Sequence, residues 1–262
     1  MNTTATAPTA MTSTAARVTD RAHWLEQRLA LLEREKALSR LSDELAAARR
    51  ALPWVRMDKP YVFGTPQGPR ALADLFEGRS QLLVQHFMLG PGWAQGCPSC
   101  SYMADHSDGM LPHLHARDVT LVAVSRAPLD EIERFRRRMG WRFPWVSSHG
   151  SDFNRDFGVS FTPAEVAAQS MHYNFAQQPF ANEEMPGVSV FARNEAGEVF
   201  HTYSTYGRGV EVMMGTYRLL DLTPRGRHEQ GLEHTMAWVR HHDRYEPAPA
   251  AQGGGSCCGS HA

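Results

Sequence analysis

The sequence has neither a basic excess nor a long apolar run, and each absence excludes a class of partner. Its 27 lysine and arginine residues are matched by 28 aspartate and glutamate residues, so the charge needed to neutralise nucleic-acid phosphates is missing. No apolar stretch approaches the roughly 18 residues that a membrane span requires. We therefore expect neither nucleic acid nor a membrane among the partners.

The first residues also lack the features of a secretory signal. Residues 1–20 are rich in threonine and alanine, but they have neither a basic start nor an apolar central stretch. The dinucleotide-binding pattern G-x-G-x-x-G does not occur in the chain either. We expect residues 1–19 to form a disordered tail and the protein to be cytoplasmic.

Cysteine is scarce, and its distribution is informative. The 262 residues contain 4 cysteines in two close pairs, Cys97 with Cys100 and Cys257 with Cys258. A small secreted domain held together by disulfides spreads its cysteines along the chain. Close pairs suit redox exchange or metal binding in a reducing compartment.

Residues 20–51 have the pattern of one long helix. Apolar residues recur every seven positions at Trp24, Leu31, Leu38 and Leu45. Gln27 and Arg34 interrupt the second apolar seam that an extended coiled coil would need. We therefore expect a helix that packs on its own domain or on a neighbouring subunit, which would allow a homo-oligomer.

Residues 52–227 alternate strand and helix signals, as in an α/β domain with a partly parallel sheet and helices on its faces. The predicted strands cover residues 61–63, 81–88, 119–124, 145–148, 188–191 and 198–203. The predicted helices begin at Pro98, with a break around Gly109 and Pro112, and cover residues 129–139 and 210–220. Residues 160–184 fit this pattern poorly and are predicted to form an insertion. We expect a C-terminal helix within residues 228–246 and a flexible tail over 247–262.

The segment GCPSCSY places the first cysteine pair at the start of a helix. Pro98 suits the first helical position, which makes Cys97 the N-cap residue. Its sulfur would then face free backbone N–H groups, a setting that lowers cysteine pKa values. We therefore assign Cys97 as the nucleophile and Cys100 as the residue that resolves the mixed disulfide.

A Cys-x-x-Cys pair also occurs in zinc sites, which need a second ligand pair of similar kind. The remaining cysteines, Cys257 and Cys258, are adjacent in the tail, an unusual arrangement for structural zinc. Soft-metal binding by all four thiols remains the alternative to redox exchange. The tail pair could instead serve as auxiliary thiols that reach the first pair.

The segment MPGVSVF, downstream of the cysteine pair, resembles the loop of thioredoxins in which a cis-proline leads into a strand. By this resemblance, Pro186 is cis and forms a substrate groove with Met185, while Trp93 adds an apolar wall.

Residues 52–227 also resemble a bacterial family, the thioredoxin-like proteins catalogued as domain of unknown function 899. The segments that carry this resemblance are LPWVRMDKPYVF, GCPSCSYMADH, VTLVAVSRAPL, MGWRFPWVSSHGSDFNRDFGVSFTP, MPGVSVF and VFHTYSTYGRG. The resemblance implies a thioredoxin-like fold and a dithiol-disulfide oxidoreductase activity. Its partners would be a disulfide-containing protein or a small thiol substrate, and a cellular reductant that makes a bound cofactor unnecessary.

Two further residues are candidates for assisting the cysteines. His86 ends the strand before the cysteine loop and could move a proton, or it could be a buried, hydrogen-bonded histidine. Arg126 follows strand 119–124 and could stabilise a thiolate or hold a carboxylate, or it could be a solvated loop residue.

A peroxidase of the peroxiredoxin type is disfavoured, because Ala94 stands where that motif places a threonine or serine before Cys97.

Overall fold

A computed structural model describes residues 18–246, and the chain divides into two compact units, Met1–Ala51 and Leu52–Ala262. The described part of the first unit is helix α1 (Arg21–Arg50), which confirms the helix expected there. The Asp20 side chain caps it by accepting a hydrogen bond from the His23 N–H at 2.8 Å. No residue of α1 is buried; Leu32 is half-buried, and the other leucines of the helix are exposed.

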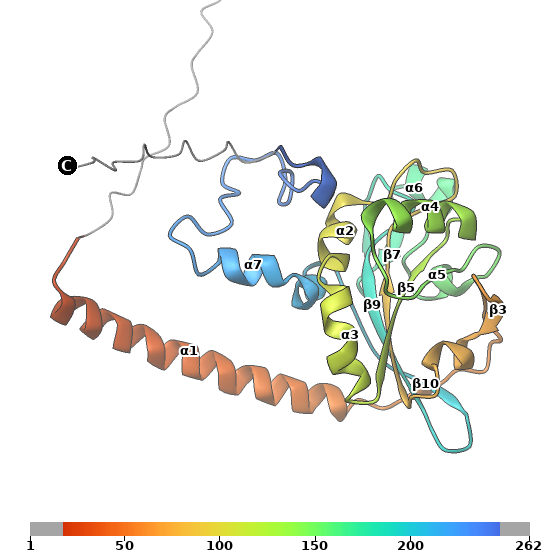
Figure 1. Cartoon of the computed structure of the whole chain (residues 1–262), viewed down its shortest axis with the longest axis horizontal. Helices are drawn as coiled ribbons and strands as arrows, with labels where there is room; N and C mark the ends of the chain where they lie inside the picture. Colours follow the sequence, from red (N-terminus) through yellow and green to blue (C-terminus); the bar gives the residue numbers. More distant parts are fainter. Residues whose placement is uncertain (1–17, 247–262) are drawn as a thin grey trace, which may run out of the picture. The chain divides into compact units, whose positions relative to one another are not determined.

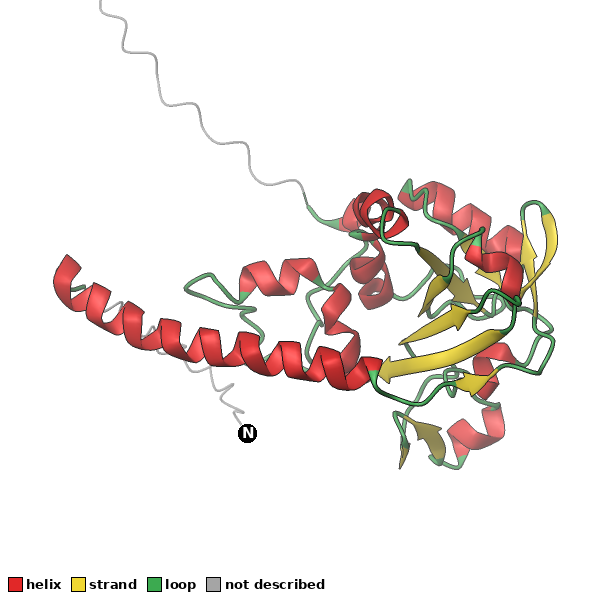
Figure 2. Cartoon of the chain, turned by 90° about the horizontal axis from the view of Figure 1, so that it is seen from below, coloured by secondary structure: helices red, strands yellow, loops and turns green. Residues whose placement is uncertain are grey.

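The second unit is built on an eight-stranded mixed sheet (Figures 1 and 2). Its strands, in spatial order, are β1 (Val55–Arg56), β10 (Val199–Tyr206), β9 (Gly187–Arg193), β4 (Gln81–His86), β5 (Val119–Ser125), β6 (Trp145–Ser147), β2 (Val62–Thr65) and β3 (Gly68–Ala71). Strand β5 is parallel to both β4 and β6, and every other pairing is antiparallel. The β9–β10 hairpin beside β4 and the crossover from β4 to β5 give the expected thioredoxin-like α/β fold.

Successive side chains of the central strands point to opposite faces of the sheet, and each face carries its own hydrophobic core. Leu83 and Phe87 point to the face covered by α2 (Pro98–Ala104), α3 (Ser107–His115) and α4 (Leu129–Met139). Leu82 and Val84 point to the other face, against η1 (Leu72–Phe76) and α5 (Phe153–Asp156). Figure 1 shows α2 and α3 following one another along the side of the sheet. The cysteine pair belongs to the first of these faces.

The segment expected as an insertion has structure of its own. It contains α6 (Pro163–Ala167) and a small second sheet of β7 (Met171–Tyr173) and β8 (Ala176–Gln178). Met171 and Tyr173 are buried with Tyr206 of β10, so this segment packs on the main sheet. An antiparallel bridge between Ser160 and Glu184 closes its base.

The helix predicted within residues 228–246 is not formed, and that prediction is wrong. Turns occupy the segment until a short 3₁₀ helix, η3 (His242–Arg244). His228 and Met236 adopt left-handed backbone angles, which end any helical run. The Glu229 carboxylate holds the segment instead, by accepting hydrogen bonds from the Met236 N–H at 2.9 Å and from the Trp238 Nε1–H at 2.8 Å.

Two smaller predictions also need correction. The break after α2 falls at Asp105 and His106, and Pro112 lies inside α3 rather than interrupting it. The helix expected over residues 210–220 is split into η2 (Gly207–Met213) and α7 (Gly215–Leu220). None of the helices within residues 18–246 is long and apolar enough to cross a membrane.

Candidate functional site

The cysteine pair lies where β4 gives way to α2. Cys97 is the N-cap residue of α2 and Pro98 occupies its first turn, as the sequence predicted. Both cysteines are free thiols; Cys97 is half-buried and Cys100 is fully buried. One of the two sulfurs can therefore meet a substrate, and the other is held inside the protein.

Three hydrogen bonds fasten this dithiol to β4 and to the residues that follow it. The Cys97 N–H donates to the Met88 carbonyl at 3.0 Å, and the Met88 N–H donates to the Cys100 sulfur at 3.5 Å. The Gln85 side chain donates to the Cys100 carbonyl at 3.3 Å. The position of both cysteines is thus set by the central strand of the sheet.

The two thiols have opposite pKa shifts. The hydrogen bond from the Cys100 thiol, with smaller contributions from the N–H groups of Cys100 and Ser99, lowers the pKa of Cys97 to about 7 although burial acts against it. Burial raises the pKa of Cys100 well above its usual value, and its hydrogen bond to Cys97 adds to the shift. The Cys97 sulfur caps no first-turn N–H in regular geometry, so these groups act on it as nearby dipoles. A large share of Cys97 is therefore thiolate at neutral pH, whereas Cys100 keeps its proton.

Gly96, just before the pair, is required by close packing. A Cβ atom at this position would lie 2.6 Å from the Phe87 ring and 2.8 Å from the Phe135 ring. The Gly96 carbonyl also accepts a hydrogen bond from His241 Nε2 at 2.8 Å. The loop can reach the core at this depth only because residue 96 has no side chain.

A cavity of about 620 Å³ opens beside the dithiol. Cys97, Cys100, Met185 and Pro186 all line it, so the structure brings together the cysteines and the two residues expected to shape a groove. Tyr173 of the inserted segment lies on the same wall; its hydroxyl accepts from the Gly207 N–H at 2.8 Å and donates to the Pro186 carbonyl at 2.7 Å. The inserted segment thus holds the proline loop in place.

The expected cis-proline is wrong, since no peptide bond in residues 18–246 is cis. The Met185 N–H donates to the Val159 carbonyl at 2.9 Å, and the Phe161 N–H donates to the Glu183 carbonyl at 2.8 Å. The chain before Pro186 therefore runs extended beside residues 159–161, a course that a trans bond follows directly.

The structure does not bring His86 to the cysteines. Its ring packs on Phe153 and Phe157 on the opposite face of the sheet, and Nε2 is 2.8 Å from the Ser189 hydroxyl. Burial lowers its pKa to about 3, so the ring is neutral. Of the two alternatives for His86, the structure therefore shows the buried, hydrogen-bonded histidine and not a group that could move a proton at the cysteines.

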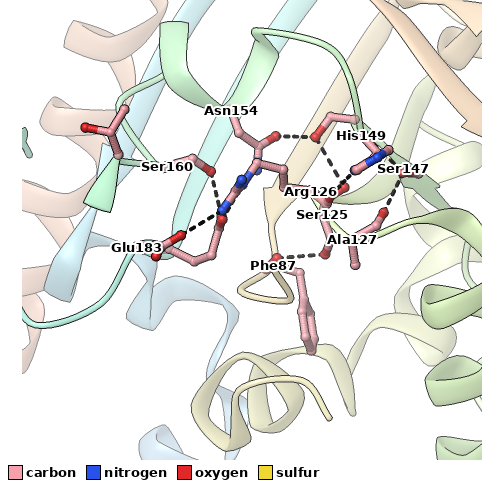
Figure 3. A network of polar contacts seen from close by, with 12 residues as sticks. Phe87, Ser125, Arg126, Ala127, Ser147, His149, Asn154, Ser160 and Glu183 are labelled. Atoms are coloured by element: carbon pink, nitrogen blue, oxygen red, sulfur yellow. Dashed lines mark hydrogen bonds and ion pairs between the residues drawn. The ribbon is translucent and has the colours of Figure 1, made fainter. Parts of the chain in front are cut away.

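Arg126 does not line the dithiol cavity, and its side chain lies in a polar network with Glu183 and Ser160 (Figure 3). Its Nε donates to Glu184 at 2.6 Å, and its Nη2 donates to Glu183 at 3.3 Å. Glu184 is almost fully buried and also accepts from the Ser160 hydroxyl at 2.5 Å. Burial raises the pKa of Glu184, and its contacts with Ser160 and Arg126 oppose that shift. Arg126 thus anchors the base of the insertion, two residues before Pro186.

Trp93 does not line the cavity. Its indole packs over Gly90, where an added Cβ would lie 3.0 Å from Nε1, and against the core under α2. The residues that sequence reasoning missed are Tyr173 and several methionines of the cavity wall. Their positions depend on contacts between distant segments, for which the sequence carries no local signal.

The described part of the chain offers no set of ligands for the metal-binding alternative. No group of three or more histidine, cysteine, aspartate or glutamate side chains there could hold a metal ion. Cys257 and Cys258, which the metal-binding alternative and the auxiliary-thiol hypothesis both require, lie outside the described residues.

Residues 13–245 match the family described as bacterial protein of unknown function, DUF899. The chain belongs to the DUF899 family. No curated protein sequence matches this DUF899 chain.

Among solved structures, the DUF899 chain is similar to peroxidoxin BcpB from Mycobacterium tuberculosis, with 13% identity and a TM-score of 0.43 over 65% of this chain and 97% of that one. Peroxiredoxin Q from Xanthomonas campestris matches at 12% identity and a TM-score of 0.43, over 65% and 98%. A putative thiol:disulfide interchange protein DsbE from Chlorobium tepidum matches at 13% and 0.37, over 64% and 98%. Likenesses this distant transfer no activity, so the chemistry of the DUF899 site has to be understood from its own residues.

Proposed function

We propose that this DUF899 protein is a thiol-disulfide oxidoreductase in which Cys97 is the nucleophile and Cys100 the resolving cysteine. The observation that carries the proposal is the asymmetry of the pair. Cys97 is half-buried at a cavity wall with a lowered pKa, and Cys100 is buried behind it with a raised pKa. This is the division of roles that exchange through a mixed disulfide needs.

The reaction begins when the Cys97 thiolate attacks one sulfur of a substrate disulfide. A mixed disulfide forms, and the other substrate sulfur leaves as a thiolate that takes up a proton. Cys100 then loses its proton and attacks Cys97, which releases the second substrate thiol and leaves a Cys97–Cys100 disulfide. The substrate has gained two electrons and two protons, and a cellular thiol reductant restores the dithiol.

Two serine substitutions test this order of events. Cys97→Ser should abolish reduction of a disulfide substrate, and Cys100→Ser should accumulate a covalent adduct with the substrate through Cys97. Mass spectrometry of the full chain under non-reducing conditions detects that adduct. A Cys97→Ser protein with undiminished turnover would contradict the assignment, as would a Cys100→Ser protein that turns over normally.

A further inference from the structure

The wall of the dithiol cavity is rich in methionine, and the proposed chemistry makes no use of this. Residues from five separate parts of the chain meet there: Met88, Met103, Met185, Met214 and Met236. The chain has 12 methionines in all, so nearly half of them gather at one cavity. Methionine side chains are flexible and polarisable, which suits a surface that adapts to apolar groups of different shapes.

The charged residues of the same cavity are paired with carboxylates of the protein. Arg227 donates to Asp221 at 2.8 Å and to Glu211 at 3.0 Å. Arg208 donates to Glu211 at 2.9 Å. A ligand carboxylate would have to compete with these pairs for the same guanidinium groups. The cavity therefore offers more to an apolar group than to an anionic small thiol such as glutathione.

The size and position of the cavity agree with an apolar occupant beside the reacting disulfide. Its volume of about 620 Å³ lies within the range of roughly 300–1,000 Å³ of pockets that enclose a ligand. Met103 and Met214 are almost fully buried, whereas Met185 and Met236 remain half-buried. The wall thus reaches from the core beside Cys100 toward solvent, along the path that a substrate must take.

We propose that the protein selects peptide or protein disulfides in which a large apolar residue adjoins the cysteine, and that the methionine wall binds that side chain. This selection rests on the proposed thiol-disulfide exchange, with Cys97 as the attacking sulfur. The bound side chain holds the substrate disulfide at Cys97 while the two electrons pass from the dithiol to the substrate. A thiol reductant that later restores the dithiol does not need to fill the cavity.

The test compares two disulfide-linked peptides that differ only in the residue beside the cysteine, leucine in one and serine in the other. The pre-reduced full chain is mixed in excess with each peptide, and the second-order rate constant is read from the peptide thiol released. We expect the leucine peptide to react at least tenfold faster, because its side chain leaves water at the methionine wall.

Methionine variants then show whether the wall causes the preference. Met236→Gln and Met185→Gln keep nearly the same side-chain length and should each lower the leucine-to-serine ratio severalfold. Met57→Gln is the matched control, since Met57 is also half-buried but packs against the other core. It should keep the ratio of the natural sequence. A ratio unchanged in both wall variants would overturn the proposal.

Hydroxyethyl disulfide separates this selection from the chemistry on which it rests. If the reduced protein reacts with hydroxyethyl disulfide but treats both peptides alike, the selection is wrong and the exchange chemistry stands. If it reduces neither that compound nor either peptide, the proposed function fails, and the selection fails with it.

Discussion

Replacing Gly96 with alanine would test how closely the cysteine loop is packed on the core. The new Cβ would lie 2.6 Å from Phe87 Cε1 and 2.8 Å from Phe135 Cε1, whereas carbon atoms in contact normally stay about 3.5–4.0 Å apart. Both rings are buried, and the Phe87 ring centroid is only 4.3 Å from that of Trp145. The rings have little room to withdraw, so the loop itself must move.

Overpacking of this kind in a close-packed core costs about 1–3 kcal/mol. We expect Gly96→Ala to lower the free energy of unfolding by that amount. The displaced loop also carries Cys97 away from the Cys100 thiol that lowers its pKa. The pKa of Cys97 should therefore rise, and its alkylation should need a higher pH.

Urea unfolding measures the first effect, and the pH profile of iodoacetamide alkylation measures the second. Gly109→Ala is the matched control, because Gly109 lies inside α3 and an added Cβ there meets nothing within 4 Å. Alanine inside a helix should stabilise the protein by about 0.5–1 kcal/mol. The reasoning would be refuted if Gly96→Ala were as stable as the natural sequence with an unchanged alkylation profile.

Three further predictions concern stability and assembly. Burial lowers the pKa of His86 to about 3, so below pH 6.5 the unfolded state binds a proton on this imidazole that the folded state does not bind. The free energy of unfolding should therefore fall by about 2 kcal/mol between pH 7 and pH 5, as measured by urea unfolding. His86→Gln should reduce this dependence on pH. Arg126→Met leaves the buried Glu184 without its cation and should cost about 3–5 kcal/mol, whereas Arg134→Met, at an exposed pair, should cost under about 1 kcal/mol; similar losses would contradict the role of burial. If α1 joins two copies, Leu38→Asp should reduce the mass found by light scattering, and a monomeric natural protein would end that hypothesis.

The positions of the central strands along the chain and the start of α2 could be predicted because their signals are local. The continuous apolar run of residues 81–88, the dipeptide Cys97-Pro98 and the turn residues NEAG at 194–197, between two predicted strands, each identify an element within a few residues of chain. Pro98 in the first helical position placed Cys97 correctly as the N-cap.

The assignments that failed depend on long-range contacts or on the side to which a strand residue points. His86 and Gln85 are neighbours in β4, yet Gln85 contacts Cys100 and His86 packs on the opposite face. Successive side chains of a strand point to opposite faces of the sheet, so a shift of one residue decides which face His86 occupies. The sequence near the end of the strand does not specify this face. Arg126 does follow strand β5, as the sequence predicts, but its partner Glu184 comes from the inserted segment, whose packing no local pattern reveals.

The helix expected within residues 228–246 failed for a different reason. The left-handed backbone angles at His228 and Met236 and the hydrogen bonds that Glu229 accepts from Met236 and Trp238 favour a compact loop. These features lie within the segment itself, and they outweigh its preference for a helix.

A redox titration of the Cys97–Cys100 pair tests the central claim most directly. The full chain is equilibrated in glutathione buffers of defined potential without added metal, and its thiols are counted by alkylation and mass spectrometry. We expect a reversible two-electron disulfide between Cys97 and Cys100, with a midpoint in the range of about −270 to −120 mV found for related folds. A pair that never forms this bridge, or thiols that resist alkylation until a chelator is added, would contradict the account and favour metal binding.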